Sequence, residues 1–400
     1  MSEASEAEML SILFVDDDRS VLDGLRRALR TERDAWRMEF CESGEAALAA
    51  MSNQSFDVVV SDMRMPGMDG AEFLAEVRRL SPSSARIVLS GYAEFASLVR
   101  SSQVAHQFLD KPCDTEVIKA SVERIARCRA AVAPSAIRDL LGALEVLPTP
   151  GKTYEELATA MQGDYDIATL GAIVSGDIAL TAEILRLVNT PFFGLVRSLV
   201  SVDEAVGFLG SDVLTAIVAS RSVFVDVADG PVDVAGVNKH SRSTANLAAK
   251  FAECSGAAKS ARAEAFAAGL LHDVGVLALA GATHLHGPRF LQTLDFDDVL
   301  TERLEFGVDR FSIGQHLLML WGFSDVVVDA VIEMAHPLEL APRDGVGWIV
   351  RVAHEALTSG AVSNEEAMAS TVSELAATLE QVEAELLDNR TPSGAVRSNA

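Results

Sequence analysis

Residues 11–128 alternate between short β-rich runs and longer helical stretches, and this alternation limits the fold more than any other feature of the chain. The β-rich runs are SILFVDD, MEFCES, FDVVVSD, ARIVLSG and HQFLDKP. The helical stretches between them include VLDGLRRALR and GAEFLAEVRRL. Alternation of this kind favours a parallel sheet covered by helices on both faces. We therefore expect residues 9–130 to form a five-stranded, doubly wound α/β domain.

Polar side chains stand where these predicted strands end. Asp16 and Asp17 end the first run, Asp62 ends the third, Ser90 ends the fourth and Lys111 follows the fifth. Because the carboxyl ends of parallel strands meet at one edge of the sheet, ligands bind at that edge. Three carboxylates gathered there repel one another and need a cation to stay ionised. Oxygen ligands suit Mg²⁺, which often pairs with a phosphate group.

The remaining polar residues at this edge suit phosphoryl transfer. Lys111 would place a positive charge beside a phosphoryl oxygen, and Ser90 would add a hydroxyl donor. In such a site the Asp62 carboxylate attacks a phosphorus atom, and the acyl phosphate that forms is stabilised by the cations and the hydroxyl. The sequence therefore predicts a phosphoacceptor aspartate.

Four stretches of this region, VDDD, SDMRMPGMDG, LSGYAE and FLDKP, resemble in order and spacing the receiver domain of two-component response regulators. The resemblance implies that Asp62 takes its phosphoryl group from a sensor histidine kinase. It implies that Ser90 and Phe108 form a switch pair, with Lys111 contacting the phosphoryl group. It also implies a set of Mg²⁺ ligands and neighbours: Asp16, Asp17, Asp62 and the backbone carbonyl of Arg64.

Beyond the predicted sheet, strand patterns fade and apolar residues recur at spacings of three and four, as on helices. We expect a helical linker over residues 131–150 and a separate all-helical domain over residues 135–357. Ser201 and Glu204 form a capping-box pattern at the start of one helix, and Gly210 is placed to end it.

A stripe of apolar residues near the end follows the four-three spacing of a heptad repeat: Met368, Val372, Leu375, Leu379, Val382 and Leu386. This stripe predicts a C-terminal helix over residues 361–388, which either packs on its own domain or pairs with a second copy. Fewer than four heptads are present, so the sequence favours packing on the same chain. Residues 389–400 are polar and are predicted to form a flexible tail.

Five stretches of the helical half match one known family in sequence: DIALTAEILRLVNTPFFGL, SVDEAVGFLG, NKHSRSTANLAAKFA, EAFAAGLLHDVGVLAL and GQHLLMLWGFSDVVVDAVIEMAHP. These stretches resemble the HDOD family, a set of helical output domains related to HD-type phosphohydrolases. The resemblance implies an output domain that acts through protein contacts.

Within this half, the resemblance implies a vestigial HD metal site formed by His240, His272, Asp273 and His354. Val276 stands where HD hydrolases carry a lysine, and His354 stands where they carry a ligand aspartate. Adjacent helical residues diverge by about 100°, so His272 and Asp273 could share a metal only at a helix end or with both side chains bent inward. We favour a buried pair in which the carboxylate accepts a hydrogen bond from the ring, and we expect no second metal in this domain.

Charge and cysteine usage exclude other classes of protein. The formal net charge of −25 repels phosphodiester backbones, so we expect no direct nucleic-acid binding. The acidic N-terminus lacks the pattern of a signal peptide, and no uninterrupted apolar run reaches the ~20 residues of a membrane helix. The four cysteines lack paired spacing, which favours reduced thiols in the cytoplasm: Cys41, Cys113, Cys128 and Cys254.

Taken together, the sequence predicts a cytoplasmic response regulator of a two-component phosphorelay, phosphorylated on Asp62, whose helical half binds an unknown downstream protein. The alternative is a receiver-regulated, metal-dependent phosphohydrolase of the HD type acting on a nucleotide or cyclic dinucleotide. A third hypothesis makes homodimerisation through the C-terminal helix the output. The incomplete HD ligand set favours the non-enzymatic role.

Overall fold

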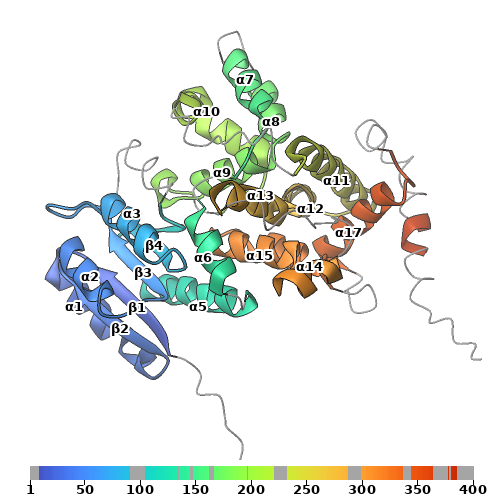
Figure 1. Ribbon diagram of the computed structural model, residues 1–400. Coiled ribbons are helices and arrows are strands. Elements are labelled where there is room, and N and C mark those ends of the chain that lie inside the picture. Colours follow the sequence, from blue (N-terminus) through green and yellow to red (C-terminus); the bar gives the residue numbers. More distant parts are fainter. Residues whose placement is uncertain are drawn as a thin grey trace, which may run out of the picture.

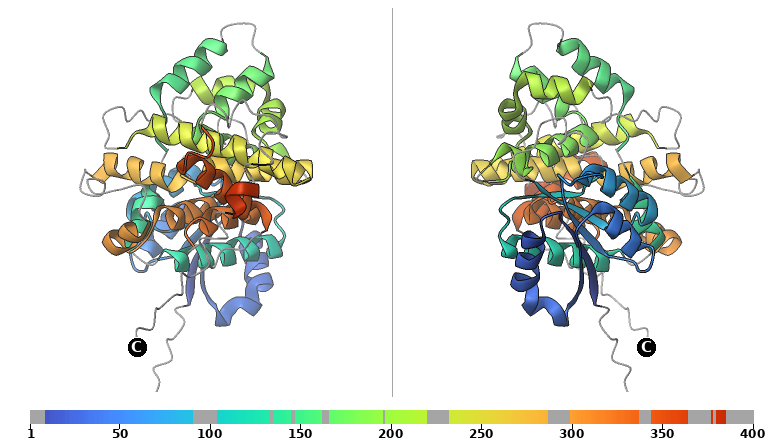
Figure 2. Two further views of the ribbon diagram at one scale, coloured as in Figure 1. Left: turned by 90° about the vertical axis from the view of Figure 1, so that its right-hand side faces the viewer. Right: turned by 90° about the vertical axis from the view of Figure 1, so that its left-hand side faces the viewer.

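The structure, a computed structural model, consists of a sheet-containing N-terminal domain and a larger helical domain (Figure 1). It describes residues 9–363 apart from 91–103, 133–134, 145–146, 162–165, 196, 220–231, 287–298 and 337–343, together with residue 377 and residues 380–384. Figure 2 shows the chain from two further sides, with the sheet-containing domain in front of the helical domain in its right-hand view.

The N-terminal domain is built on five parallel strands in the order β2-β1-β3-β4-β5. The strands are β1 (Leu10–Val15), β2 (Trp36–Cys41), β3 (Val58–Asp62), β4 (Ala85–Ser90) and β5 (Gln107–Asp110). The strand order reverses direction between β1 and β3, and this reversal opens a crevice at their carboxyl ends. The prediction of a five-stranded parallel sheet is confirmed.

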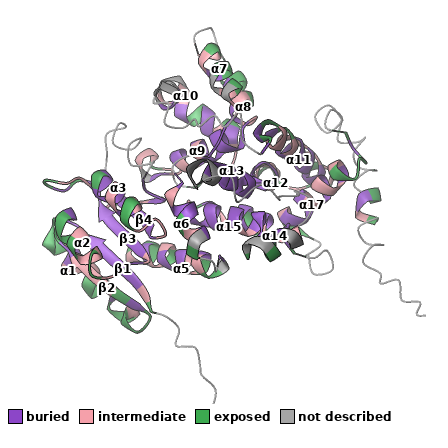
Figure 3. Cartoon of the chain, in the orientation of Figure 1, coloured by how far each residue is buried: buried purple, intermediate pink, exposed green. Residues whose placement is uncertain are grey.

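Helices cover both faces of this sheet: α1 (Arg19–Ala28), the 3₁₀ helix η1 (Leu29–Asp34), α2 (Gly44–Met51), α3 (Gly70–Leu80) and α5 (Thr115–Ala131). Alternate strand residues point to opposite faces. Leu13 and Val59 pack into a core with α2 and α3, whereas Ile12 and Val58 pack with α1 and α5. Figure 3 shows β1, β3 and β4 as buried over most of their length, whereas the centre of β2 is only partly buried.

The helical domain carries the remaining elements: α6 (Ser135–Ala143), α7 (Gly151–Ala160), α8 (Ile167–Val174), α9 (Ile178–Val188), η2 (Pro191–Phe193), α10 (Val202–Ala219), α11 (Val234–Cys254), α12 (Lys259–Leu271), α13 (Val274–His286), α14 (Val299–Phe306), α15 (Arg310–Leu320), α16 (Asp325–Glu333) and α17 (Gly345–Thr358). The predicted combination of an α/β domain with a helical domain is confirmed. The hydroxyl of Ser201 accepts a hydrogen bond from the Glu204 amide at 3.3 Å, as its capping pattern predicts. Gly210, at φ +70°, separates two helical segments within α10.

The core of the helical domain is continuous with one face of the sheet. Helix α5 packs on the sheet through Ile118 and Ile125 and also contacts α15, so a single apolar cluster runs from the strands into the helices. Figure 1 shows α5 lying beneath α6 and α15. The two domains therefore share a buried boundary.

Most of the predicted C-terminal helix, and the whole predicted tail over residues 389–400, lie outside the described residues. Of its apolar stripe the structure describes Val382, which is buried. The indole of Trp348 on α17 donates to the carboxylate of Glu383 at 3.1 Å, so this short segment packs on its own chain.

One stretch of the described residues, Lys259–Gly281, is long and apolar enough to meet the length and composition of a membrane span. Of its most apolar window, 83% is buried inside the domain. A core helix of a folded domain passes the same test, and α12 and α13 supply this core.

Candidate functional site

The three carboxylates predicted to meet at one edge of the sheet do so. Asp16 follows β1, Asp17 comes next, and Asp62 is the last residue of β3. One carboxylate oxygen from each lies within 4.8 Å of the others. Asp16 and Asp62 are buried and Asp17 is exposed, so the cluster opens to solvent on the Asp17 side.

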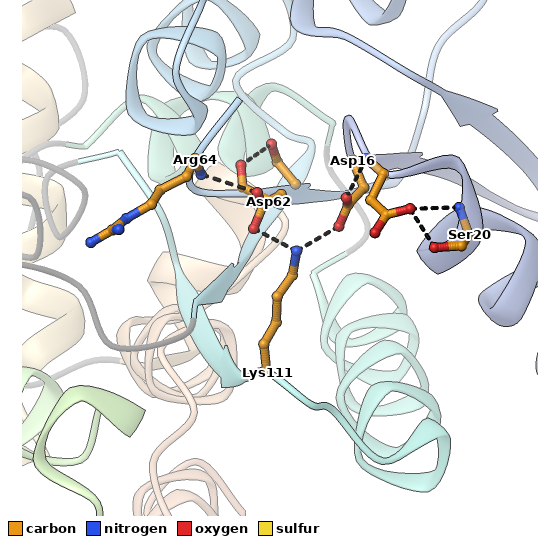
Figure 4. Close-up of polar contacts among 7 residues, drawn as sticks. Asp16, Ser20, Asp62, Arg64 and Lys111 are labelled. Atoms are coloured by element: carbon orange, nitrogen blue, oxygen red, sulfur yellow. Dashed lines mark hydrogen bonds and ion pairs between the residues drawn. The ribbon is translucent and has the colours of Figure 1, made fainter. Parts of the chain in front are cut away.

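Lys111, directly after β5, reaches into this cluster (Figure 4). Its ammonium lies 2.6 Å from Oδ2 of Asp16 and 2.6 Å from Oδ1 of Asp62. Burial alone would lower the pKa of Lys111, but the bonds to both carboxylates raise that pKa above its ordinary value. Burial raises the pKa of Asp62; the nearby Asp16 adds to this, and Lys111 acts in the opposite direction.

Backbone groups fix the two buried carboxylates. The amide of Asp18 donates to Oδ1 of Asp16 at 2.9 Å, and the amide of Arg64 donates to Oδ2 of Asp62 at 3.1 Å. Gly70, the first residue of α3, packs so closely that a Cβ there would lie 2.2 Å from the carbonyl oxygen of Asp62. The glycine therefore lets α3 begin directly beside the end of β3.

The predicted switch residues lie on the adjacent strands β4 and β5. Ser90 is the last residue of β4, and its carbonyl accepts a hydrogen bond from the Lys111 amide at 2.9 Å. Phe108 lies in β5, where it is half-buried and contacts both apolar cores of the domain. The predicted site residues thus lie at or just after the carboxyl ends of β1, β3, β4 and β5, except for Phe108, which lies within β5.

The arrangement fits a Mg²⁺ ion. The Lys111 ammonium offsets one of three negative charges, so a divalent cation would match the remainder. The carboxylate oxygens are hard ligands within coordinating reach of one centre. The amide of Arg64 donates to Asp62, which places Arg64 at the same edge; its carbonyl stays a Mg²⁺ ligand that the resemblance implies.

The helical domain gathers a second group of ionisable residues. His240 on α11, His272 after α12 and His354 on α17 each place a ring nitrogen within 4.8 Å of the others. His272 and Asp273 occupy the break between α12 and α13, a helix end of the kind that lets adjacent side chains share one site. Burial, followed by the His272 ring, lowers the pKa of His354 to about 3.

The buried His272–Asp273 pair differs from its predicted form. Nε2 of His272 lies 3.1 Å from Oδ2 of Asp273, but it has no hydrogen-bond partner. Asp273 instead accepts from the Ser241 hydroxyl at 3.1 Å, and Nδ1 of His272 lies 2.7 Å from the Gly269 carbonyl. The predicted ring-to-carboxylate hydrogen bond is therefore not formed.

The junction between the domains was not predicted from the sequence. The Gln107 amide on β5 donates to the carbonyls of Met319 and Leu320 at 3.2 and 3.1 Å. Arg124 on α5 donates to the Phe323 carbonyl and lies 3.2 Å from the Asp325 carboxylate. These donors from the N-terminal domain reach carbonyls at and just beyond the C-terminal end of α15, where a helix leaves its last carbonyls without partners inside the helix; the Met319 carbonyl also accepts from the Gly322 amide at 3.1 Å.

Arg86 on β4 makes a second link across this boundary. Its guanidinium is buried and donates to the backbone carbonyl of Gly142 on α6 at 2.8 Å. Its other acceptors include the carbonyls of Pro82, Ser84 and Val104. Burial lowers the pKa of Arg86 to about 9. No sequence pattern distinguishes this arginine from an ordinary strand residue.

Fold and carboxylate edge together define the class of the N-terminal domain. The family model of the response regulator receiver domain matches residues 12–123, and that of the HDOD domain matches residues 147–337. The chain therefore contains a response regulator receiver domain followed by an HDOD domain.

Curated relatives share a segment of about receiver length. The transcriptional regulatory protein YesN of Bacillus subtilis is 37% identical over 120 residues, which cover 29% of this chain and 32% of that protein. The DNA-binding transcriptional regulator NtrC of Salmonella typhimurium is 35% identical over 114 residues, which cover 28% of this chain and 24% of that protein. The chain thus spans a third or less of these relatives.

Among solved structures, the MmoQ response regulator from Methylococcus capsulatus is 27% identical to this chain. The superposition covers 58% of this chain and 98% of that one, with a TM-score of 0.47.

Proposed function

We propose that Asp62 accepts a phosphoryl group from a sensor histidine kinase. An Asp62 oxygen attacks the phosphorus of a phosphohistidine; the new P–O bond forms as the P–N bond breaks, and the freed imidazole nitrogen then takes up a proton. The observation that carries this proposal is the Lys111 ammonium held 2.6 Å from both Asp16 and Asp62. It lies where charge on a transferring phosphoryl group needs a cation.

Mg²⁺ held by Asp16, Asp17, Asp62 and the Arg64 carbonyl would supply further positive charge to the phosphoryl oxygens. Residues of the chain itself orient the Asp62 carboxylate and supply a second positive charge and a hydroxyl. The Arg64 amide orients the Asp62 carboxylate, Lys111 keeps it paired, and Ser90 at the end of β4 supplies a hydroxyl on the neighbouring strand.

We propose that the helical domain reads the phosphorylated state through the junction. Phe108 lines a cleft of about 540 Å³ between the domains, together with Arg124 of α5 and Trp321 beyond α15. A switch of Ser90 and Phe108 would change the wall of this cleft and the contacts that hold the end of α15. The output we propose is a change in how the HDOD domain binds a downstream protein.

The other proposed properties follow from charge and thiol state. The four cysteines are free, in keeping with a cytoplasmic protein. The net charge of −25 argues against direct nucleic-acid binding, although YesN and NtrC are transcriptional regulators. Homodimerisation through the C-terminal segment stays a prediction that light scattering with and without phosphodonor can test.

The alternative, a metal-dependent phosphohydrolase, has less support. Val276, at the position where a cation would meet substrate phosphate, is buried and apolar. Arg310 places a positive charge near Asp273 that would repel a metal cation there. We therefore propose signalling through protein contact rather than hydrolysis.

The direct test is phosphorylation by acetyl phosphate with Mg²⁺, followed by intact-mass analysis. We expect one added phosphoryl group on the wild type and none on Asp62→Asn. Asp110→Asn is the matched control, because Asp110 ends β5 at the same edge but is not part of the carboxylate cluster. An adduct that persists in Asp62→Asn would assign the acceptor elsewhere.

A further inference from the structure

A cleft in the helical domain lies between the first turns of α10 and α12 and the sides of α8 and α11. Its volume is about 820 Å³, within the range of about 300–1,000 Å³ that is typical of small-molecule sites. Arg242 of α11 lines this cleft, whereas His240 of the same helix belongs to the histidine cluster. Residues two apart on a helix point about 200° apart. The cleft therefore lies on a different side of α11 from the histidine cluster.

The charge of this cleft is opposite to the charge of the whole chain. Among the described residues that line it, Arg242, Lys259 and Arg262 are cationic and Asp203 is acidic. The chain as a whole carries a formal net charge of −25. A cleft lined mainly by charges of one sign concentrates ligands of the opposite sign. The ligand that this lining favours is an anion.

Arg242 supplies the cationic group that the protein itself leaves open. Its side chain is half-buried, and no described residue forms a hydrogen bond or an ion pair with it. Arg262, by contrast, lies 2.7 Å from the Glu253 carboxylate. Gly176, in the turn after α8, leaves room for the guanidinium, because a Cβ there would lie 3.2 Å from Nη1 of Arg242. A guanidinium held in this way can bind a phosphate or carboxylate group through two parallel hydrogen bonds.

The start of α12 adds hydrogen-bond donors to the same cleft. Its N-cap residue, Ala258, makes no side-chain cap, and the first turn contains no acidic residue. The first backbone amides of such a helix lack partners within the helix and favour an anion. Lys259, whose side chain is 93% exposed, places a further positive charge at the rim.

The remaining lining of the cleft is largely apolar. Phe266 on α12 is half-buried, and Ile167 at the start of α8 is 51% exposed. Asn246, one turn beyond Arg242 on α11, has no hydrogen bond to a described residue. An inorganic anion would leave the apolar surface in water, whereas a ligand with an apolar body would cover it.

We propose that this cleft binds a small organic anion. Its phosphate or carboxylate group pairs with Arg242 and with the backbone amides at the start of α12, and its apolar body covers Phe266 and Ile167. Asp203 at the start of α10 would repel a second negative group, so the ligand carries a single anionic head. The site uses none of the residues at the carboxylate edge of the sheet.

The test uses the full-length protein and the fluorescent aromatic anion anilinonaphthalene sulfonate (ANS) as the probe. We expect one ANS site per chain, bound at least about tenfold more weakly by Arg242→Gln, because a charge-assisted hydrogen bond is lost. Phenyl phosphate and hydrocinnamate carry the two possible heads on an aromatic body, and the one that displaces ANS at the lower concentration identifies the head. Inorganic phosphate and acetate, which lack the body, and benzyl alcohol, which lacks the charge, should displace ANS only at concentrations roughly tenfold higher or more.

Lys239→Gln is the matched control, because it removes one positive charge from an exposed position of α11 outside the cleft and should leave ANS binding unchanged. Ala263→Glu, which places a negative charge inside the cleft, is a second variant that should weaken binding. Circular dichroism shows which variants fold. The proposal is wrong if the wild type has no ANS site, if a folded cleft variant binds ANS as the wild type does, or if benzyl alcohol competes as well as the two phenyl anions.

Discussion

Lys111 reduces the repulsion between the carboxylates at the edge of the sheet, because its ammonium pairs with both buried members of the cluster, Asp16 and Asp62. Lys111→Met is expected to lower the Tm of the protein in EDTA, because Asp16 and Asp62 then repel each other without compensation. Mg²⁺ should raise the Tm of this variant more than that of the wild type, because more repulsion is relieved on binding. Thermal unfolding with and without Mg²⁺ measures both effects.

Lys119→Met is the control, because it removes one positive charge from the same domain at a distance from the carboxylate cluster. The Lys119 ammonium pairs with Glu32 and Glu116, both at 3.1 Å, away from the carboxylate edge. Its removal should leave the Mg²⁺-induced shift unchanged. Equal shifts in the wild type and Lys111→Met would show that Lys111 does not compensate the cluster.

His316 on α15 makes the free energy of unfolding depend on pH. Burial lowers its pKa from 6.5 to about 4, with Cys128, Arg129 and Arg138 as the neighbouring groups. As the pH falls below 6.5 the unfolded chain takes up a proton that the folded chain does not, so stability decreases down to about pH 4. His316→Gln should remove about 2 kcal/mol of the loss between pH 7 and pH 5. Urea unfolding at both pH values checks this, and matching pH profiles for the two proteins would contradict it.

The connection between β3 and α3 depends on a close backbone approach. In Gly70→Ala the new Cβ would lie 2.2 Å from the Asp62 carbonyl oxygen, so β3 or α3 must shift. We expect a lower free energy of unfolding and a reduced yield of phosphorylated protein, since the shift displaces Asp62 itself. Urea unfolding and intact mass after acetyl phosphate treatment report the two effects.

Gly24 offers the matched comparison, because it lies within α1 and a Cβ there would meet nothing within 4 Å. Gly24→Ala should stabilise the protein by about 0.4–1 kcal/mol by reducing the freedom of the unfolded chain. It should leave phosphorylation unchanged. If Gly70→Ala behaved in the same way, the close approach would not matter.

At the level of elements, the sequence predicted the sheet and its functional edge because one local pattern determines both. Alternating β and α runs define a parallel sheet, and its strand ends then place Asp16, Asp62 and Lys111 together. The contact of Gln107 with Met319 could not be predicted in this way. Helical periodicity identifies a buried face but not its partner, and these two residues are 212 positions apart.

The whole molecule is connected by packing rather than by a linker alone. One apolar cluster extends from the strands through α5 to α15, and Arg86 ties β4 to α6. A continuous path of packed residues and hydrogen bonds thus connects the receiver sheet with the helical domain. The histidine cluster shows the same limit of prediction: the resemblance named its residues, but only the fold reveals that Nδ1 of His272 faces the Gly269 carbonyl.

Amide hydrogen exchange of the full chain tests most directly whether the charge state of Asp62 reaches the helical domain. The wild type and Asp62→Asn are compared with and without acetyl phosphate and Mg²⁺, and intact mass confirms phosphorylation. We expect altered exchange in α5 and in residues 317–325, at the end of α15, in the phosphorylated wild type and in neither state of Asp62→Asn. Unchanged exchange in residues 317–325 of a protein that carries the phosphoryl group would contradict transmission through this junction.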